Sequence, residues 1–277
     1  MLMQKEKEFI MVDFIQKNSY NIDDLIEIVR LLRGKNGCPW DMEQTHKSIK
    51  SDFIEEVCEA IEAIDLEDTE LLKEELGDVL LQVVFHCQIE TENKNFSFDD
   101  ICDGICKKMI VRHPHVFGSV TVADSGEVLK NWDNIKQKTK GQETYAETLE
   151  SVAKSLPALM RAQKVGKRAN RAGMDFKSAE DSMKCMDSEI IELYDAFHNG
   201  TQAEVEEELG DVLFSCVNTA RLLGIDAEQA LNKAVNKFIR RFAETEKLVR
   251  LNGVDDMKSL GIDELDAYWQ KAKESLD

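Results

Sequence analysis

The sequence has little of what sheets, disulfide frameworks and membrane spans require. It contains only 3 Pro and 14 Gly among 277 residues, too little turn chemistry for a many-stranded sheet. Its 7 Cys include no C-x-x-C pair, so neither a disulfide framework nor a zinc site is expected. No apolar run approaches the roughly 18 residues of a membrane span, and the first residues are too acidic for a signal peptide. We therefore expect a cytoplasmic protein with no membrane partner.

Basic residues are the minority. The chain has 35 Lys and Arg against 54 Asp and Glu, which gives a net charge of -19. That charge opposes attraction to a nucleic-acid backbone, so we expect no nucleic acid as partner. Hydrophobic residues at 43% and charged residues at 32% describe a chain that folds. The abundance of Glu, Lys, Leu and Ala favours an all-α fold.

The chain contains an internal repeat. The segment Glu-Glu-Leu-Gly-Asp-Val-Leu at residues 74–80 recurs letter for letter at residues 207–213, an offset of 133. Further features recur in the same order along both halves. We therefore expect two homologous helical domains, residues 20–139 and 156–277, joined by a linker at residues 140–155.

Each half carries two pairs of acidic residues at helical spacing. Residues three apart share one face of a helix, and the interval between the pairs suits an antiparallel hairpin of two helices. Four carboxylates would then converge and repel one another, so a hard divalent cation, Mg²⁺ or Mn²⁺, is expected between them. A solvated acidic face is the alternative, but identical spacing within two apolar helices argues against it. The predicted metal ligands are Glu56, Glu59, Glu75 and Asp78 in the first half and Glu189, Glu192, Glu208 and Asp211 in the second.

Two expectations concern the packing of these helices. The stretch over residues 71–89 is so apolar that we expect its helix to be mostly buried. Gly77 and Gly210 fall inside the acidic helices, where Gly costs about 1 kcal/mol relative to Ala. A close approach between helices beside the site would explain why they are tolerated.

Basic and aromatic residues follow the acidic pairs in the same order in both halves. A Lys and an Arg one turn apart suit the phosphates of a nucleotide, and a Trp four residues before a Lys suits a base and a phosphate. The sequence has no Gly-rich phosphate loop, so metal and side chains must hold the phosphates. The predicted substrate-binding residues are Lys108, Arg112, Trp132 and Lys136 in the first half and Lys237, Arg241, Trp269 and Lys273 in the second.

The histidines leave alternatives open. His113 and His115 flank Pro114 and form either a metal clip or, more in keeping with such spacing, a loop anchor. His46 belongs either to a base pocket or to a helix cap.

These motifs together resemble the MazG family of nucleoside triphosphate pyrophosphohydrolases. The resemblance rests on Glu-Glu-x-x-Glu at residues 55–59, Glu-x-x-Asp at residues 75–78, and the motifs at residues 37–41 and 112–117. It implies two tandem MazG-like helical domains of the four-helix-bundle type and a homodimer. It also implies Mg²⁺-dependent cleavage of nucleoside triphosphates to monophosphate and pyrophosphate.

The resemblance also implies catalytic residues. We expect Glu55, Glu56 and Glu189 to act in catalysis. The family's leading Glu is present as Glu55, but the equivalent residue in the second half is Ser188, which cannot act as a carboxylate base. Two other hypotheses stay open: a dUTPase- or dCTPase-like diphosphatase with a narrow base specificity, and a helical dimeric scaffold whose catalytic sites have decayed.

Overall fold

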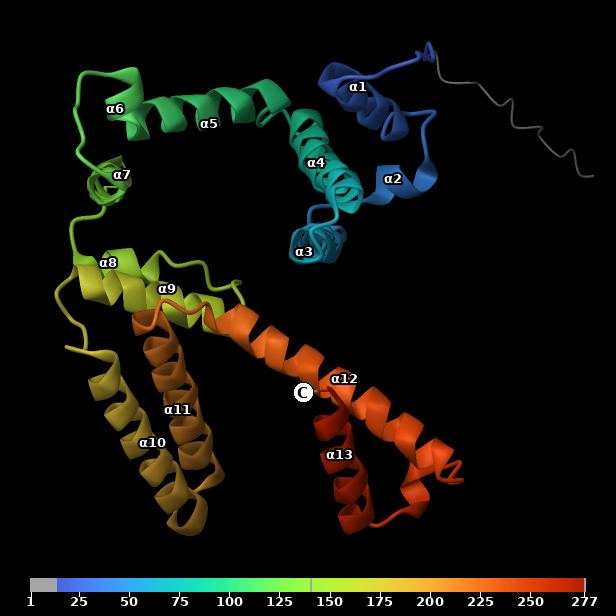
Figure 1. Ribbon diagram of the computed structural model, residues 1–277. Coiled ribbons are helices and arrows are strands. Elements are labelled where there is room, and N and C mark those ends of the chain that lie inside the picture. Colours follow the sequence, from blue (N-terminus) through green and yellow to red (C-terminus); the bar gives the residue numbers. More distant parts are fainter. Residues whose placement is uncertain (1–13, 140, 277) are drawn as a thin grey trace, which may run out of the picture. The chain divides into compact units, whose positions relative to one another are not determined.

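The structure, a computed structural model, describes residues 14–139 and 141–276, without the side chains of residues 129, 130 and 138. The described residues form helices and contain no strand, which confirms the all-α fold (Figure 1). The elements in chain order are α1 (Ile22–Leu32), α2 (Pro39–Glu43), α3 (Lys50–Asp65), α4 (Thr69–Glu92), α5 (Phe98–Arg112), α6 (Pro114–Phe117), α7 (Ser125–Thr139), α8 (Tyr145–Glu150), α9 (Ala158–Arg171), α10 (Ala179–Asn199), α11 (Gln202–Leu222), α12 (Ala227–Leu251), the short 3-10 helix η1 (Met257–Ser259) and α13 (Ile262–Leu276).

The chain divides into two compact units. Unit 1 is Met1–Asp133 and unit 2 is Asn134–Asp277, so the division falls inside α7. The segment expected as a linker, residues 140–155, contains α8, which packs on α9 of unit 2. The domain limits drawn from the sequence stay a prediction.

Unit 1 is built around the hairpin of α3 and α4. Asp68 accepts hydrogen bonds from the first backbone N–H groups of α4, which fixes the start of this helix after the turn. At the other end of α4, helix α1 and the segment before α3 cover its C-terminal half and bury one apolar cluster. The cluster comprises Val29, Ile49, Val84, Phe85 and Ile89.

The expectation that residues 71–89 are mostly buried is therefore correct only for the second half of α4. Val84, Phe85 and Ile89 are buried, but Leu76 and Leu80 are 53% and 39% exposed. Helix α4 packs on α3, and Leu76 and Leu80 in its first half stay exposed.

The segment between α1 and α3 is anchored by one arginine. The Arg33 guanidinium makes a two-point ion pair with Glu92, at 2.9 and 2.8 Å, and also lies 5.1 Å from the centre of the Phe85 ring. Its Nη1 donates to the carbonyl oxygens of Asp41 and Gln44. This arginine therefore ties α2 and the following residues to the end of α4.

His46 is a second anchor of the same segment. Its Nε2 donates to Glu90 Oε1 at 2.5 Å, and its Nδ1 lies 2.7 Å from Nδ1 of His86 on α4. Asn95 holds the other oxygen of Glu90. His46 thus connects the residues before α3 to α4. Within residues 14–139 and 141–276, no helix is capped by a side-chain hydrogen bond of His46.

His113 also anchors a loop. It forms a 2.7 Å hydrogen bond through Nδ1 to the carbonyl of Met109, and its ring meets the edge of Trp132. This contact agrees with the loop-anchor interpretation of the segment around Pro114.

Unit 2 contains the second acidic hairpin, α10 and α11, with α9 against α11 (Figure 1). A buried hydrogen bond of 2.9 Å between the hydroxyls of Ser182 and Thr219 joins the two helices near the open end of the hairpin. Gln163 on α9 binds the backbone of Ile225 and Ala227, which fixes the start of α12. Helix α12 then packs along α13.

The glycines inside the acidic helices do not mark a close helix contact. A Cβ atom added at Gly77 or Gly210 would meet no atom within 4 Å. The expectation of a close approach at these positions is wrong within the described chain, because both glycines lie on exposed faces of their helices.

Among the described residues, none of the helices combines the length and the apolar character that crossing a lipid bilayer demands.

Breaking one buried ion pair should destabilise unit 2. Asp175 receives two hydrogen bonds from the Arg221 guanidinium, and these two side chains are only 14% and 7% exposed. Hydrogen bonding by Arg221 lowers the pKa of Asp175 to about 2, so its stabilising effect is lost as the pH falls from about 4 through about 2. We expect Asp175→Asn to lower the unfolding free energy by about 3 kcal/mol in urea titrations at pH 7.

The matched control is Glu180→Gln, which breaks the exposed ion pair with Lys184. Such a pair contributes at most about 1 kcal/mol. Equal losses in the two variants would contradict the importance of the buried pair.

Candidate metal centre

Two helices of unit 1 bring three carboxylates together. Glu56 lies on α3, and Glu75 and Asp78 lie one turn apart on α4. One oxygen of each lies within 4.8 Å of the others. All three residues are half-buried. The antiparallel hairpin produces this meeting, because the acids of both helices lie on the faces that meet.

Unit 2 repeats the arrangement at the same offset of 133 residues. Glu189 on α10 and Glu208 and Asp211 on α11 place one oxygen each within 4.8 Å of one another. Thr201 and Glu204 form a capping box at the start of α11, which fixes this helix after the turn. We call the two sets cluster 1 (Glu56, Glu75, Asp78) and cluster 2 (Glu189, Glu208, Asp211).

The carboxylates of both clusters repel one another. Burial and then the charges of Asp78 and Glu59 raise the pKa of Glu56. Burial and then Glu59 raise the pKa of Glu75, and burial and then Glu192 raise the pKa of Glu208. Every charge that contributes to these shifts is negative, so a cation would relieve the repulsion.

The donor atoms fit a hard cation. Both clusters offer carboxylate oxygens alone, without His or Cys among the three gathered residues. Such a set suits Mg²⁺ or Mn²⁺, which take oxygen ligands and keep several waters. Zinc would require nitrogen or sulfur donors.

The fourth predicted ligand of each half lies close to its cluster but outside the tightest group. Glu59 and Glu192 are exposed, and their charges reach Glu75 and Glu208 respectively. Ser188 Oγ donates to Glu192 Oε1 at 3.1 Å. The role of these two acids as ligands stays a prediction.

The predicted base, Glu55, is exposed at the edge of cluster 1. Its charge contributes to the raised pKa of the adjacent Glu56. In unit 2 the equivalent Ser188 is engaged with Glu192. The surroundings of the two clusters therefore differ at this position.

The structure brings together part of the predicted substrate-binding set in unit 1. The Arg112 guanidinium lies 5.3 Å from the centre of the Trp132 ring, a cation–π contact between the end of α5 and α7. Lys108 is exposed one turn before Arg112. Lys136 lies one turn after Trp132 on α7, in the part of that helix assigned to unit 2.

In unit 2 the predicted set lies on α12 and α13, which pack together. Trp269 is half-buried against Phe238, with 5.1 Å between the ring centres. Lys237 is exposed beside Phe238, and Arg241 and Lys273 are half-buried. These residues and cluster 2 thus sit on separate helix pairs of unit 2.

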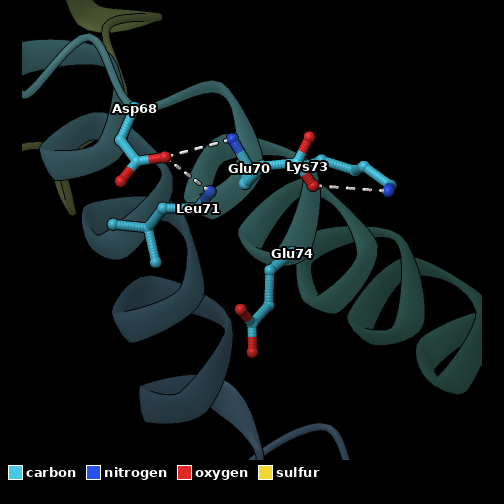
Figure 2. Close-up of a pocket in the computed structure, with 5 residues that line it drawn as sticks. All are labelled: Asp68, Glu70, Leu71, Lys73 and Glu74. Carbon is cyan, nitrogen blue, oxygen red and sulfur yellow. Dashed lines mark hydrogen bonds and ion pairs between the residues drawn. The ribbon is translucent and has the colours of Figure 1, made fainter.

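A surface hollow of about 490 Å³ lies at the closed end of the first hairpin (Figure 2). Figure 2 shows Asp68 turned toward the backbone of Glu70 and Leu71, while Lys73 pairs with Glu70 at 3.6 Å. Glu74 completes the lining. None of the three acids of cluster 1 lines this hollow, so it is distinct from cluster 1.

The sequence analysis missed the residues directly behind the clusters. Gln82 lies one turn after Asp78 on α4, and its side chain partly offsets the burial and the neighbouring charges that raise the pKa of Glu56. In unit 2 the Cys185 thiol donates to Glu189 Oε1, with Sγ 3.6 Å from the oxygen. The internal repeat could have drawn attention to this position, because the equivalent residues of the two halves, Gln82 and Ser215, differ.

Comparison with known proteins agrees with these two repeated centres. The family model of the MazG nucleotide pyrophosphohydrolase domain matches the chain twice, over residues 44–117 and 177–244. The chain is 42% identical over 251 residues to the nucleoside triphosphate pyrophosphohydrolase/pyrophosphatase MazG of Thermotoga maritima, covering 91% of this chain and 95% of that protein. It is 43% identical over 255 residues to the nucleoside triphosphate pyrophosphohydrolase of Escherichia coli K12, covering 91% and 97%.

A more distant relative matches the same share of this chain at lower identity. The nucleoside triphosphate pyrophosphohydrolase of Mycolicibacterium smegmatis is 30% identical over 264 residues, covering 91% of this chain and 71% of that protein. Both matched segments contain one acidic hairpin with its cluster. The chain belongs to the MazG family of nucleotide pyrophosphohydrolases.

Proposed function

We propose that the protein hydrolyses nucleoside triphosphates to monophosphate and pyrophosphate, with Mg²⁺ or Mn²⁺ bound at the acidic clusters. The observation that carries this proposal is the pair of carboxylate clusters with an oxygen-only donor set, in which burial and neighbouring negative charges raise the pKa of Glu75 and of Glu208. Relatives that match over most of their length bear the same activity in their names.

Glu56, Glu75 and Asp78 would hold the cation in unit 1, and Glu189, Glu208 and Asp211 would hold it in unit 2. The bound ion supplies Lewis-acid polarisation of a phosphate oxygen and lowers the pKa of a water. Holding it requires all carboxylates ionised, which the mutual repulsion within each cluster resists at low pH.

Water attacks the α-phosphorus. The bond between this phosphorus and the oxygen that bridges it to the β-phosphorus breaks, and pyrophosphate leaves. In unit 1, Glu55 is the exposed carboxylate beside the cluster that accepts the proton of this water. In unit 2, Ser188 occupies that position, and Glu189 is the acid assigned to orient the water. Unit 2 therefore has the weaker proton acceptor.

The basic and aromatic residues serve the nucleotide. Arg241 and Lys237 lie one turn apart on α12 and can neutralise the charge that builds up on the leaving pyrophosphate. Trp269 offers an indole face next to Lys273, one turn further along α13. Lys108, Arg112, Trp132 and Lys136 are the equivalent residues of the first half.

A second copy of the chain would cover apolar faces that one copy leaves exposed. The exposed positions recur at the offset of 133: Ile61 and Ile64 in unit 1 correspond to Tyr194 and Phe197 in unit 2, with 48%, 57%, 65% and 70% exposure. Two packed hairpins make a four-helix bundle, so a homodimer would bury these faces. It would also offer α12 and α13 of one copy to the cluster of the other.

All seven cysteines are free thiols. Reduced cysteines are typical of the cytoplasm, which is where we place the enzyme and its nucleotide substrates.

Glutamine at one acid of each cluster should abolish turnover. We expect the double variant Glu75→Gln, Glu208→Gln to lose at least about 100-fold in pyrophosphate release with Mg²⁺, because the ion's contribution is worth several kcal/mol. Each single variant then reports the share of one unit. Pyrophosphate, not phosphate, is the product to measure over a panel of ribo- and deoxyribonucleotides.

Matched controls are Glu70→Gln on α4 and Glu206→Gln on α11, which lie outside the clusters. Unchanged release in the double variant would refute the assignment. A single dominant substrate in the panel would favour the narrow diphosphatase, and no release by the native chain would favour the decayed scaffold.

Divalent cations should stabilise the protein, and more so at higher pH. The raised pKa of Glu56, Glu75 and Glu208 means that these carboxylates bind a proton more readily in the folded state, so protonation at low pH competes with the cation. At saturating Mg²⁺ we expect the midpoint of thermal unfolding to rise by a few degrees at pH 7.5 and by less at pH 5. An equal rise in the double glutamine variant would contradict binding at the clusters.

Charged residues on the exposed apolar faces should separate the copies. We expect Ile61→Glu combined with Tyr194→Glu to convert the dimer to a monomer, measured by light scattering after size exclusion, because buried unpaired carboxylates are costly. Lys73→Glu, on an exposed position beside the hollow, is the control and should leave the dimer intact. A native chain that is monomeric at micromolar concentration would refute the dimer.

A further inference from the structure

Two histidines that the proposed chemistry does not use lie against each other in unit 1. His46 comes from the segment before α3, and His86 comes from the C-terminal half of α4. Their Nδ1 atoms are 2.7 Å apart, and their ring planes lie within 12° of parallel, with 4.9 Å between the ring centres. Nitrogens at this distance share one hydrogen, because two lone pairs or two N–H groups would repel each other. The contact is therefore an N–H···N hydrogen bond between two imidazoles.

The far edge of the His46 ring is fixed by a carboxylate. Its Nε2 donates to Glu90 Oε1 at 2.5 Å, and Glu90 lies one turn after His86 on α4. Asn95 holds the second oxygen of Glu90 at 2.6 Å. Hydrogen bonding by Asn95 and then by His46 lowers the pKa of Glu90, so this carboxylate stays ionised in mild acid. His46 therefore carries a hydrogen on Nε2 whatever the state of its Nδ1.

These contacts limit the number of protons that the pair of rings can hold. From α4 the pair faces the Glu90 carboxylate, and from α3 it faces the uncharged Phe53 ring. The two rings have four nitrogens, but the space between the Nδ1 atoms accepts only one hydrogen. The pair can thus carry three hydrogens, and hence one positive charge, while the contact lasts. A fourth hydrogen places two N–H groups against each other and separates the rings.

Acid should therefore open this contact. The His46 side chain is 42% exposed, so protons reach the pair from solvent. Burial and then the charge of His46 lower the pKa of His86 from its ordinary value of 6.5, and the stability that depends on neutral His86 is lost as the pH falls below that value. The neighbouring anchor persists in the same range, because hydrogen bonding by Arg33 lowers the pKa of Glu92 and keeps their ion pair intact.

We propose that His46 and His86 form a proton-operated latch, which holds residues 45–49 against α4 while at most one ring is charged and releases them when both rings are charged. Ile49, at the end of this segment, packs in the buried cluster of unit 1, and α3 follows directly. Release would therefore loosen the start of α3. The latch does not depend on the proposed hydrolytic activity.

Hydrogen–deuterium exchange of the full chain tests the latch. The amides of Thr45 and Ile49 are hydrogen-bonded within the segment, so their exchange reports its opening. After correction for the intrinsic effect of pH on exchange, we expect protection at residues 45–49 to fall about tenfold between pH 8 and pH 5, the effect of losing one hydrogen bond.

One variant isolates the latch from other effects of acid. His86→Gln has no ring to protonate, so its protection at residues 45–49 should not depend on pH in this range. The acidic clusters are intact in this variant, which separates the latch from protonation of their carboxylates. His198→Gln is the matched control: His198 is an exposed histidine on α10 in unit 2, and its loss should leave the native pH dependence unchanged.

Nuclear magnetic resonance of the native chain labelled with ¹⁵N-histidine needs no variant. At pH 8, His46 Nε2 and one of the two facing Nδ1 atoms should carry a hydrogen, and at pH 5 all four ring nitrogens should. Two bare Nδ1 atoms at pH 8, protection at residues 45–49 that does not change with pH, or the same loss of protection in folded His86→Gln would each overturn the proposal.

Discussion

Repulsion among carboxylates is the constraint on which this structure depends. Each acidic hairpin holds three acids with one oxygen of each within 4.8 Å of the others, and the charges that raise the pKa of Glu75 and of Glu208 are all negative. The hairpins must therefore be held together elsewhere. In unit 1 the buried cluster around Val84 does so, and in unit 2 the hydrogen bond between Ser182 and Thr219 contributes. These contacts keep the acids of each hairpin close together despite their repulsion, as is common at functional sites.

Much of this arrangement follows from local rules and was predictable. Acids three residues apart on a helix share a face whatever the helix packs against, and the exact repeat excluded coincidence. The sequence could not reveal burial, because burial depends on what covers a helix. Leu76 and Leu80 are as apolar as Val84 and Phe85, yet only the last two are covered by α1 and its neighbours. Gly77 and Gly210 were misjudged for the same reason.

The side-chain contacts made by the acids could not be predicted from the sequence either. Cys185 lies at a position that has no motif of its own, and its contact with Glu189, one turn further along α10, depends on the direction of its side chain. By contrast, the sequence analysis grouped Arg112 and Trp132 only as residues expected to bind the same substrate. The structure shows it as a direct cation–π contact between residues twenty positions apart in sequence.

The net charge of -19 bears on how such a protein meets an anionic nucleotide. A strongly negative surface attracts cations and repels a bare triphosphate. Divalent ions at the proposed sites, or on the arriving nucleotide, would reduce that repulsion where the phosphates must lie. In unit 2, Lys237, Arg241 and Lys273 lie on the α12–α13 pair, whereas the acids of cluster 2 lie on α10 and α11. Because the acids proposed for the cation and the basic residues proposed for the phosphates come from different helix pairs, the two groups can act on different parts of a metal–nucleotide complex.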